Sequence, residues 1–411
     1  MEKFFQKISE NGLKSVDSGE KDATIKADRS EEDVAVSEQH AVPQGNLNAK
    51  SRMYRALYET RDFCSKQALA RRCSVSMPTM YQNLSELMEE GLVRYSGEGR
   101  STGGRRAQGL EIVPDARFSV GISVTEKYLR LIAADLRLSE MAYQTVSFDI
   151  CRHLEDGTAD LSAILEAFLD DFSLDRKKLL GVGITIPGML TKDHSGIFFA
   201  PTLGLRDVPL LPLIENIPYP VYVDNDGSAS GHAECFVGRG PRDMAYLSLE
   251  NGVGGAVLIG GDLYSGANER SGEFGHLCVE PGGLPCACGK LGCLEPYCSP
   301  LRIENAFGVT LDEFFQGVAD HNPDYETMLY DMLRHLAIAV NNIHMTLDCD
   351  VILGGFFSEY LQPWLPVLKS YIRAGDPFNG DAEFVRLSTL RHHITPLGAA
   401  LHFIREFIRQ V

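Results

Sequence analysis

Long hydrophobic runs are absent from this sequence of 411 residues. No stretch approaches the roughly 18 consecutive apolar residues that a membrane-spanning helix needs, and the N-terminal residues lack the apolar core of a secretion signal. These absences exclude an integral membrane protein and an exported one, so we expect a cytoplasmic protein without a membrane partner. The hydrophobic content of 44% allows more than one filled core, and two or three domains are expected.

An excess of positive charge is also absent, because the formal net charge is −17. A strongly acidic average counts against nucleic acid as a partner. The charge is unevenly distributed, however. Residues 47–113 hold eleven Lys/Arg against seven Asp/Glu, a net of +4, whereas residues 1–46 have a net of −4. This small basic region is where a DNA-binding module would lie.

The acidic segment 1–46 is rich in Glu, Asp, Lys and Ser and poor in large apolar side chains after Phe5. Such a composition cannot bury enough apolar surface to offset the entropy of ordering, so we predict a disordered leader. A short helix anchored by its two phenylalanines is the alternative.

Residues 47–113 have the pattern of three short helices followed by two strands. Apolar spacing predicts a helix from Ala49, and Ser65 and Ser76 are expected to cap two more. Pro78 suits the first turn of the third helix. The runs LVRYS and AQGLEIV then alternate like strands around a glycine-rich turn. The whole pattern predicts a winged helix-turn-helix.

The third of these helices would enter the major groove of DNA, where Gln and Asn can pair with adenine and hydroxyls can reach phosphate or base. Arginines of the wing would contact the DNA backbone. A structural or dimerising module with solvated arginines is the alternative. The expected DNA contacts are Ser76, Thr79, Tyr81, Gln82, Asn83, Arg94, Arg100, Arg105 and Arg106.

Beyond Pro114 the pattern changes to alternating strands and helices, which is typical of an α/β domain. The segment MAYLSLENGVGGAVLIGGDL echoes FSVGISVTEKYLRLIAADL in its strand-turn-strand design. We therefore predict two related α/β lobes within residues 114–411.

Five of the ten cysteines lie between residues 278 and 298. In a reducing compartment such crowding indicates a metal rather than disulfides. Zinc prefers four thiolate or imidazole ligands in a tetrahedron, and His276, Cys286, Cys288 and Cys293 offer such a set, with glycines between them that let the loop fold around an ion. A ligand set complete within the protein predicts a structural Zn²⁺ site in the loop 276–295. Unliganded packing cysteines are the alternative.

The segment HLCVEPGGLPCACGKLGCLE resembles the signature of the ROK (repressor, ORF, kinase) family, in which a His and three Cys bind zinc and the last Glu faces a sugar. Two further motifs of that family are similar to DNDGSASGHAE and TIPGM. In the first of them, Asp224 stands where the family usually has Glu. The resemblance implies an actin-like (ribonuclease H-like) domain of two lobes, with Cys278 and Cys298 as ordinary buried thiols. The sugar-binding residues that it implies are Gly188, Asn225, Asp226, Glu273, His276 and Glu295.

In kinases of this family Asp226 would be the general base toward a sugar hydroxyl. Phosphoryl transfer also needs glycine-rich turns that approach the phosphates. The Asp-x-Gly-Gly-Thr string of those kinases is replaced by GISVTEK, in which Thr125 and Glu126 stand at the glycines, and the second phosphate loop reads ENGVGG. We therefore expect no enzyme. A sugar kinase with an added DNA-binding domain and a scaffold without either activity are the alternatives.

These observations lead to the hypothesis of a transcriptional regulator, in its simplest form a repressor, of sugar metabolism genes. A homodimer or tetramer would bind operator DNA through its winged helices. A monosaccharide or sugar derivative would close the two lobes and move the DNA-binding domains, to the extent that it prefers the closed conformation.

Overall fold

The computed structural model describes residues 48–60, 63–98, 108–155, 160–238, 242–378, 380–390 and 393–411, all within one structural unit. The leader 1–46 and the expected DNA contacts Arg100, Arg105 and Arg106 lie outside the described residues. Among the described helices, none is both long and apolar enough to cross a bilayer.

Three short helices come first. They are α2 (Ala49–Glu59), α3 (Lys66–Arg72) and α4 (Met77–Glu89). Ser65 Oγ accepts a hydrogen bond from Ala68 N at 3.2 Å, and Ser76 Oγ accepts one from Thr79 N at 3.3 Å. A hydroxyl in this position satisfies a backbone donor that the helix itself leaves free. The two predicted N-caps are therefore confirmed.

A small antiparallel sheet follows these helices. Its strands are β1 (Cys64–Ser65), β3 (Gln108–Ile112) and β2 (Val93–Glu98), in that spatial order. The sequence predicted β2 and β3, but the pairing of β1 with β3 is an addition. A strand of two residues is too short to show the alternation that identifies a strand.

Two mixed sheets of five strands each form the rest of the core. The first contains β4 (Phe118–Val124), β5 (Tyr128–Asp135), β6 (Glu140–Ser147), β7 (Leu179–Ile186) and β11 (Val221–Asn225). The second contains β12 (Met244–Leu249), β13 (Val253–Ile259), β14 (Asp262–Leu263), β15 (Asp350–Gly354) and β16 (Val385–Leu387).

The two sheets have the same topology. The first has the order β11-β7-β4-β5-β6 and the second β14-β13-β12-β15-β16, which is the same order read from the opposite edge. In each, three successive strands form an antiparallel meander, and two later strands add in parallel beside the first of them. The predicted relation between two lobes is thus confirmed in the strand order.

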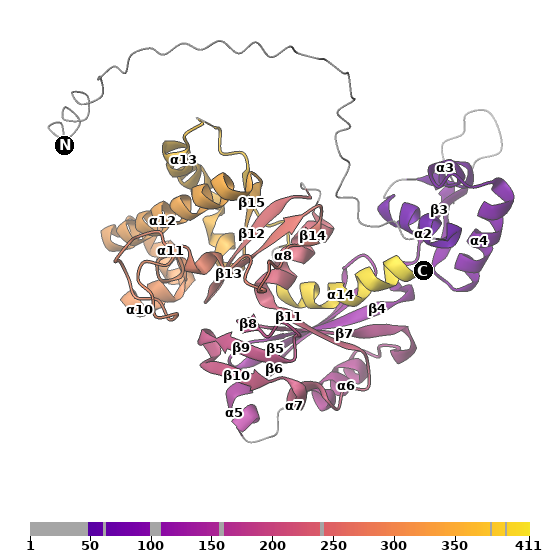
Figure 1. The fold of residues 1–411 in the computed structure, drawn as a ribbon, viewed down its shortest axis with the longest axis horizontal. Coiled ribbons are helices and arrows are strands. Elements are labelled where there is room, and N and C mark those ends of the chain that lie inside the picture. The colour runs from indigo at the N-terminus through magenta and orange to yellow at the C-terminus, as the bar shows by residue number, and fades with distance from the viewer. Residues whose placement is uncertain are drawn as a thin grey trace, which may run out of the picture. The chain divides into compact units, whose positions relative to one another are not determined.

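Two helices lie between the sheets, as Figure 1 shows: α8 (Asp226–Val237) and α14 (Ile394–Gln410). Glycines allow the close approach. A Cβ built on Gly121 or Gly183 of the first sheet would lie 1.8 Å from a backbone oxygen of α14, and one on Gly231 of α8 would lie 2.6 Å from Ala256 of the second. The resulting layers are first sheet, α14, α8 and second sheet. Helix α14 begins two residues before Pro396.

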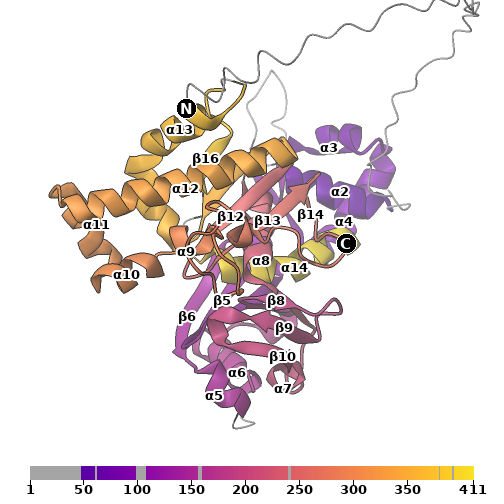
Figure 2. The ribbon, with the colours of Figure 1, turned by 60° about the vertical axis from the view of Figure 1, so that its left-hand side comes forward.

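Strand alternation directs the other face of each sheet to a second layer of helices. In the first lobe, Val120 and Ile122 pack with Phe168 of α6 (Ser162–Asp171), and in the second, Leu247 and Leu353 pack in one cluster with α12 (Pro323–Leu347). Figure 2 shows α12 beside the second sheet. The remaining elements are α5 (Ile150–Glu155), β8 (Met189–Leu190), β9 (Gly196–Ala200), β10 (Leu205–Pro209), α7 (Leu211–Ile214), α9 (Glu295–Cys298), α10 (Leu301–Phe307), α11 (Leu311–Ala319) and α13 (Leu365–Gly375).

Candidate functional site

The four predicted metal ligands converge in the loop before α9. The ligand atoms of His276, Cys286, Cys288 and Cys293 all lie within 4.8 Å of one another. Among the described residues, they form the one group of three or more His, Cys, Asp or Glu side chains arranged in this way. Positive φ at Gly289 and Gly292 gives the loop its turns, and a Cβ on Gly292 would lie 1.8 Å from Glu280 O. This cluster could hold a metal ion.

The distances inside the cluster fit zinc. Cys288 Sγ lies 3.8 Å from Cys293 Sγ, and Cys286 Sγ lies 3.7 Å from His276 Nδ1. Two sulfurs on a tetrahedral Zn²⁺ with bonds of about 2.3 Å are about 3.8 Å apart, so these two distances have the size of the edges of a zinc tetrahedron. The two cysteines outside this set differ from each other. Cys298 is buried as predicted, but Cys278 is exposed.

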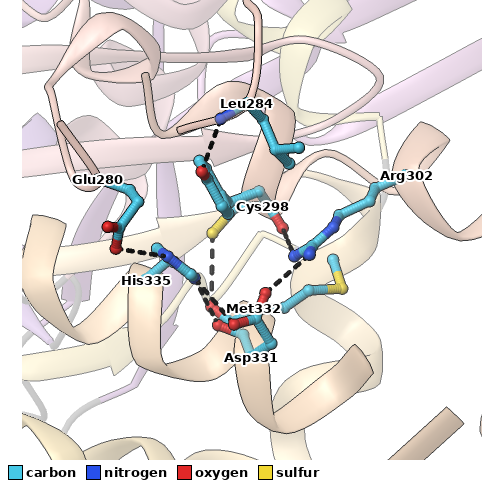
Figure 3. A network of polar contacts seen from close by, with 8 residues as sticks. Glu280, Leu284, Cys298, Arg302, Asp331, Met332 and His335 are labelled. Atoms are coloured by element: carbon cyan, nitrogen blue, oxygen red, sulfur yellow. Dashed lines mark hydrogen bonds and ion pairs between the residues drawn. The ribbon is translucent and has the colours of Figure 1, made fainter. Parts of the chain in front are cut away.

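A polar network connects residues 276–295, the metal loop, to helix α12, and Figure 3 shows this network from close by. Leu284 N donates to Tyr297 Oη at 2.8 Å, and the Tyr297 ring stacks on His335 with centroids 3.9 Å apart. His335 is buried on α12 and faces Glu280 at 3.7 Å. Arg302 extends the network with an ion pair of 2.7 Å to Asp331. Sequence reasoning missed these residues, because nothing in their spacing relates α12 to the loop.

The first group of candidate sugar residues lies where β11 passes into α8. Asn225 caps α8 by accepting from Ser228 N at 3.0 Å, and its amide donates to Gly188 O at 2.8 Å. Gly188 has φ +120°, and a Cβ there would lie 2.7 Å from Ala200. Such a φ favours glycine, so this loop conformation depends on it. The structure thus joins the TIPGM loop to the DND segment through Asn225.

Asp226 is the first residue of α8. A Cβ on its neighbour Gly227 would lie 2.9 Å from Gly255 N, so this end of α8 packs tightly on β13. Desolvation, together with the carboxylates of Glu250 and Glu273, raises the pKa of Asp226 to about 7. Glu250 belongs to the ENGVGG loop, and sequence reasoning did not assign it a role. The site therefore holds a carboxyl group that changes charge near neutral pH.

The second group of candidate sugar residues belongs to the metal loop and the turn before it. Burial raises the pKa of Glu273, whereas nearby His276 lowers it. Glu295 accepts a hydrogen bond from Val253 N at 3.0 Å, and its other oxygen lies 3.9 Å from Cys286 Sγ. His276 is thus a member of the cluster itself, and Glu295 lies directly beside it.

Some of the side chains on α4 that we expect to contact DNA are hydrogen-bonded within the helix itself. Tyr81 is 52% exposed and Gln82 is exposed, but the Asn83 amide donates to Thr79 O of its own helix at 2.7 Å. Ser76 Oγ lies 2.8 Å from Thr79 Oγ1. These hydrogen bonds fix the first turn of α4. Of the two amide side chains on this helix, only Asn83 is engaged in them, and Gln82 is left for other contacts.

Two further contacts join the surface of α4 to its neighbours. The ammonium group of Lys66 on α3 lies 5.2 Å from the Tyr81 ring and 4.8 Å from the Tyr95 ring of β2. Arg94 is an ion-pair partner of Glu111 at 2.7 Å across β2 and β3. The sequence did not single out Lys66 or Tyr95. A basic side chain among exposed aromatic rings stabilises the relative positions of α3, α4 and β2.

Two sheets of the same topology enclose two helices, and the metal loop lies beside them. This arrangement identifies the family of the chain. Residues 120–403 match the ROK family, and the chain is therefore a member of that family.

Relatives in the family include both regulators and enzymes. The chain is 32% identical over 243 residues to the xylose repressor of Bacillus subtilis (strain 168), a match that covers 57% of this chain and 62% of the repressor's length. It is 30% identical over 281 residues to the glucokinase of Halalkalibacterium halodurans, covering 61% and 85% respectively. The crystal structure of a ROK family transcriptional regulator, a homologue of the E. coli MLC protein, superposes with a TM-score of 0.69 at 19% identity, over 88% of this chain and 96% of that one.

Proposed function

We propose that this chain is a sugar-responsive transcriptional repressor. Residues 47–113 would form its DNA-binding domain and residues 114–411 its sugar-binding domain. The observation that carries the proposal is the presence, in one chain, of a three-helix module with a solvent-facing helix α4 and of a ROK domain with its polar site. The likeness to a protein named xylose repressor supports it.

The order of the helices and strands in the N-terminal module supports its assignment as a winged helix-turn-helix. Helices α3 and α4 meet at a tight turn, in which Ser74 has φ +52°, and β2 and β3 form the antiparallel pair of a wing. In this motif the second of the two helices enters the major groove. We assign that role to α4, with Ser76 and Thr79 toward phosphate and Gln82 toward base edges.

The sugar would bind among Gly188, Asn225, Asp226, Glu273, His276 and Glu295. Carboxylates and amides on two sides of a sugar can pair with neighbouring hydroxyls. Because Nδ1 of His276 faces the cysteines, its Nε2 is the nitrogen left for a hydroxyl. The relatives make D-xylose the first effector to test.

The metal of the loop would be zinc in a structural role. Four protein ligands would fill its coordination shell and leave no position for a reacting water. When bound, the ion would fix the loop geometry. His276, Cys286, Cys288 and Cys293 would hold it, and Glu295 would be oriented beside it.

A kinase is the weaker candidate, because the turn between β4 and β5 is closed on itself. Thr125 N donates to Tyr128 O at 2.9 Å, and Tyr128 N donates back to Thr125 Oγ1 at 3.1 Å. These donors are therefore engaged within the turn, and Glu126 at its tip would repel a phosphate. We infer that the chain binds sugar without phosphorylating it.

A gel-shift titration tests the proposal. Purified protein is titrated onto the DNA upstream of its own gene and onto an unrelated fragment, with and without D-xylose, D-glucose and other monosaccharides. Specific binding that one sugar weakens is the expected result. Absence of specific binding to any fragment, together with ATP consumption in the presence of a hexose, would favour the kinase. Light scattering on the same samples tests whether the chain is the proposed homodimer or a tetramer.

A further inference from the structure

Helix α14 reaches from the sugar-binding domain to the first helix of the N-terminal module. Its first turns lie between the sheets, where Thr395 Oγ1 is 3.1 Å from Ser230 Oγ of α8. Ser230 also donates to Asp226 O at 2.7 Å, so this contact is one helical turn from the candidate sugar residue. Figure 1 shows the far end of α14 (yellow) beside α2.

The far end of α14 is bound to α2 by an arginine. Arg55 donates from Nη2 to Arg409 O at 2.8 Å and from Nε to Ile408 O at 3.3 Å. Both carbonyls belong to the last turn of α14, where a cation is favoured. The ring of Tyr54 meets Phe407 edge to face, with centroids 6.3 Å apart. Met53, Tyr54 and Leu57 share one buried cluster with the apolar face of α14.

A second attachment joins α2 to the first lobe itself. Tyr58 Oη donates to Leu136 O at 2.6 Å, just beyond β5, and the Arg137 guanidinium lies 4.5 Å from the Tyr58 ring and donates to Tyr58 O. Helix α14 also packs on the first sheet. Each of the three parts, α2, α14 and the first lobe, is therefore in contact with the other two. We expect such a group to move as one body when the second lobe moves.

A buried carboxylate on α8 holds the chain where it leaves β16. Glu234 of α8 accepts from Ser388 Oγ at 2.6 Å, from Thr389 N at 3.0 Å and from Thr389 Oγ1 at 2.9 Å. These residues join β16 of the second lobe to the segment before α14. A sugar that draws the two lobes together would act on this connection between β16 and α14. The connection lies at the start of α14, whereas α2 contacts the end of that helix.

We propose that Arg55 is a positioning residue that makes DNA binding responsive to sugar, by fixing the N-terminal module to α14. This inference rests on the proposed function. Without the Arg55 contact the recognition helices still bind DNA, but the module keeps only its Ser51 and apolar contacts to α14 and its Tyr58 contact to the first lobe, so lobe closure displaces the recognition helices less. The coupling between the two ligands is then weakened, while each ligand still binds.

The test measures that coupling in the full chain for wild type, R55A, R55K and R52A. Operator affinity is measured with and without the sugar that is active in the gel shift, and sugar affinity with and without operator. Allosteric coupling typically changes an affinity about 5- to 150-fold, and the two measurements must agree because coupling is reciprocal. Arg52 is exposed on the same helix, so R52A removes the same charge and serves as the control.

We expect both ratios to fall below about twofold in R55A, to recover partly in R55K, whose ammonium can still donate to one carbonyl, and to stay at the wild-type value in R52A. A merely structural role would lower melting temperature or both affinities without changing the ratios. F407L weakens the same interface between α2 and α14 by removing the Tyr54–Phe407 ring contact, and it is the second variant if R55A does not fold. Wild-type ratios in R55A and F407L would overturn the inference and leave the proposed function intact. A wild-type protein that binds operator without any sugar response would overturn both.

Discussion

Asp226 is the residue whose environment the sequence could not reveal. The motif around it marks a candidate base, but its pKa of about 7 comes from desolvation and from Glu250 and Glu273, which lie far away along the chain. A polar residue next to a strand end is visible in a sequence. The carboxylates that the fold brings against it are not.

The raised pKa makes sugar affinity depend on pH. In the free site Asp226 is protonated below pH 7 and ionised above it. A sugar hydroxyl donates more strongly to the ionised form, so binding lowers the pKa and affinity rises from pH 6 to pH 8. Calorimetric titration with the active sugar would measure the dissociation constant across this range. A wild-type affinity that is constant over it would contradict the prediction.

Replacing Asp226 by Asn removes this titration and the negative charge. D226N should lose the sugar response and show no pH dependence of sugar binding, because the amide cannot accept in the manner of a carboxylate. Basal DNA binding should be unchanged, since Asp226 lies on α8 and not in the N-terminal module. Gel shifts of D226N with and without sugar check both points, and full sugar sensitivity would remove Asp226 from the site.

At the scale of elements, the metal loop was the most predictable part of the site, because all four ligands lie within one short segment and loop glycines separate them. The caps of α3 and α4 were equally local, and they were confirmed at Ser65 and Ser76. The short strands β1 and β8 and the helices α10 and α11 escaped prediction. Their positions depend on tertiary packing rather than on their own periodicity.

The loop offers a matched pair of cysteine variants. C288S should lower the metal content and the melting temperature together, because a structural zinc site contributes to folding through all four ligands. C278S should change neither, since Cys278 is exposed and outside the ligand cluster. Metal analysis and thermal unfolding of both variants check the prediction. A C288S protein with reduced metal and undiminished stability would show that the loop does not need the ion.

At the scale of the molecule, the echo between two sequence segments anticipated a shared topology but not how the lobes are joined. The joining depends on glycines whose neighbours are distant in sequence, such as Gly121 against Pro396 and Gly398 against Ala229. No spacing rule relates these positions. The glycines are ordinary in the sequence and become indispensable only when two backbones meet at them.

Gly121 should therefore tolerate no side chain. In G121A the new methyl would lie 1.8 Å from Pro396 O, and α14 would have to move off the sheet. We expect a loss of about 3 kcal/mol in the free energy of unfolding, at the upper end of overpacking effects. G254A is the control, because a Cβ there meets no atom within 4 Å. Denaturant unfolding compares the two, and equal stability of both variants would contradict the packing described here.

The position of α14 also has a consequence for synthesis on the ribosome. The sheet of the first lobe is complete once β11 has been made, but the helix that covers its inner face is translated only after the whole second lobe. Until then the buried cluster that contains Ile132 and Ala134 lacks the apolar face of α14. In the nascent chain, an apolar face of the first sheet therefore stays uncovered while the whole second lobe is synthesised. We expect the chain to be most prone to aggregation, and most dependent on chaperones, during this interval.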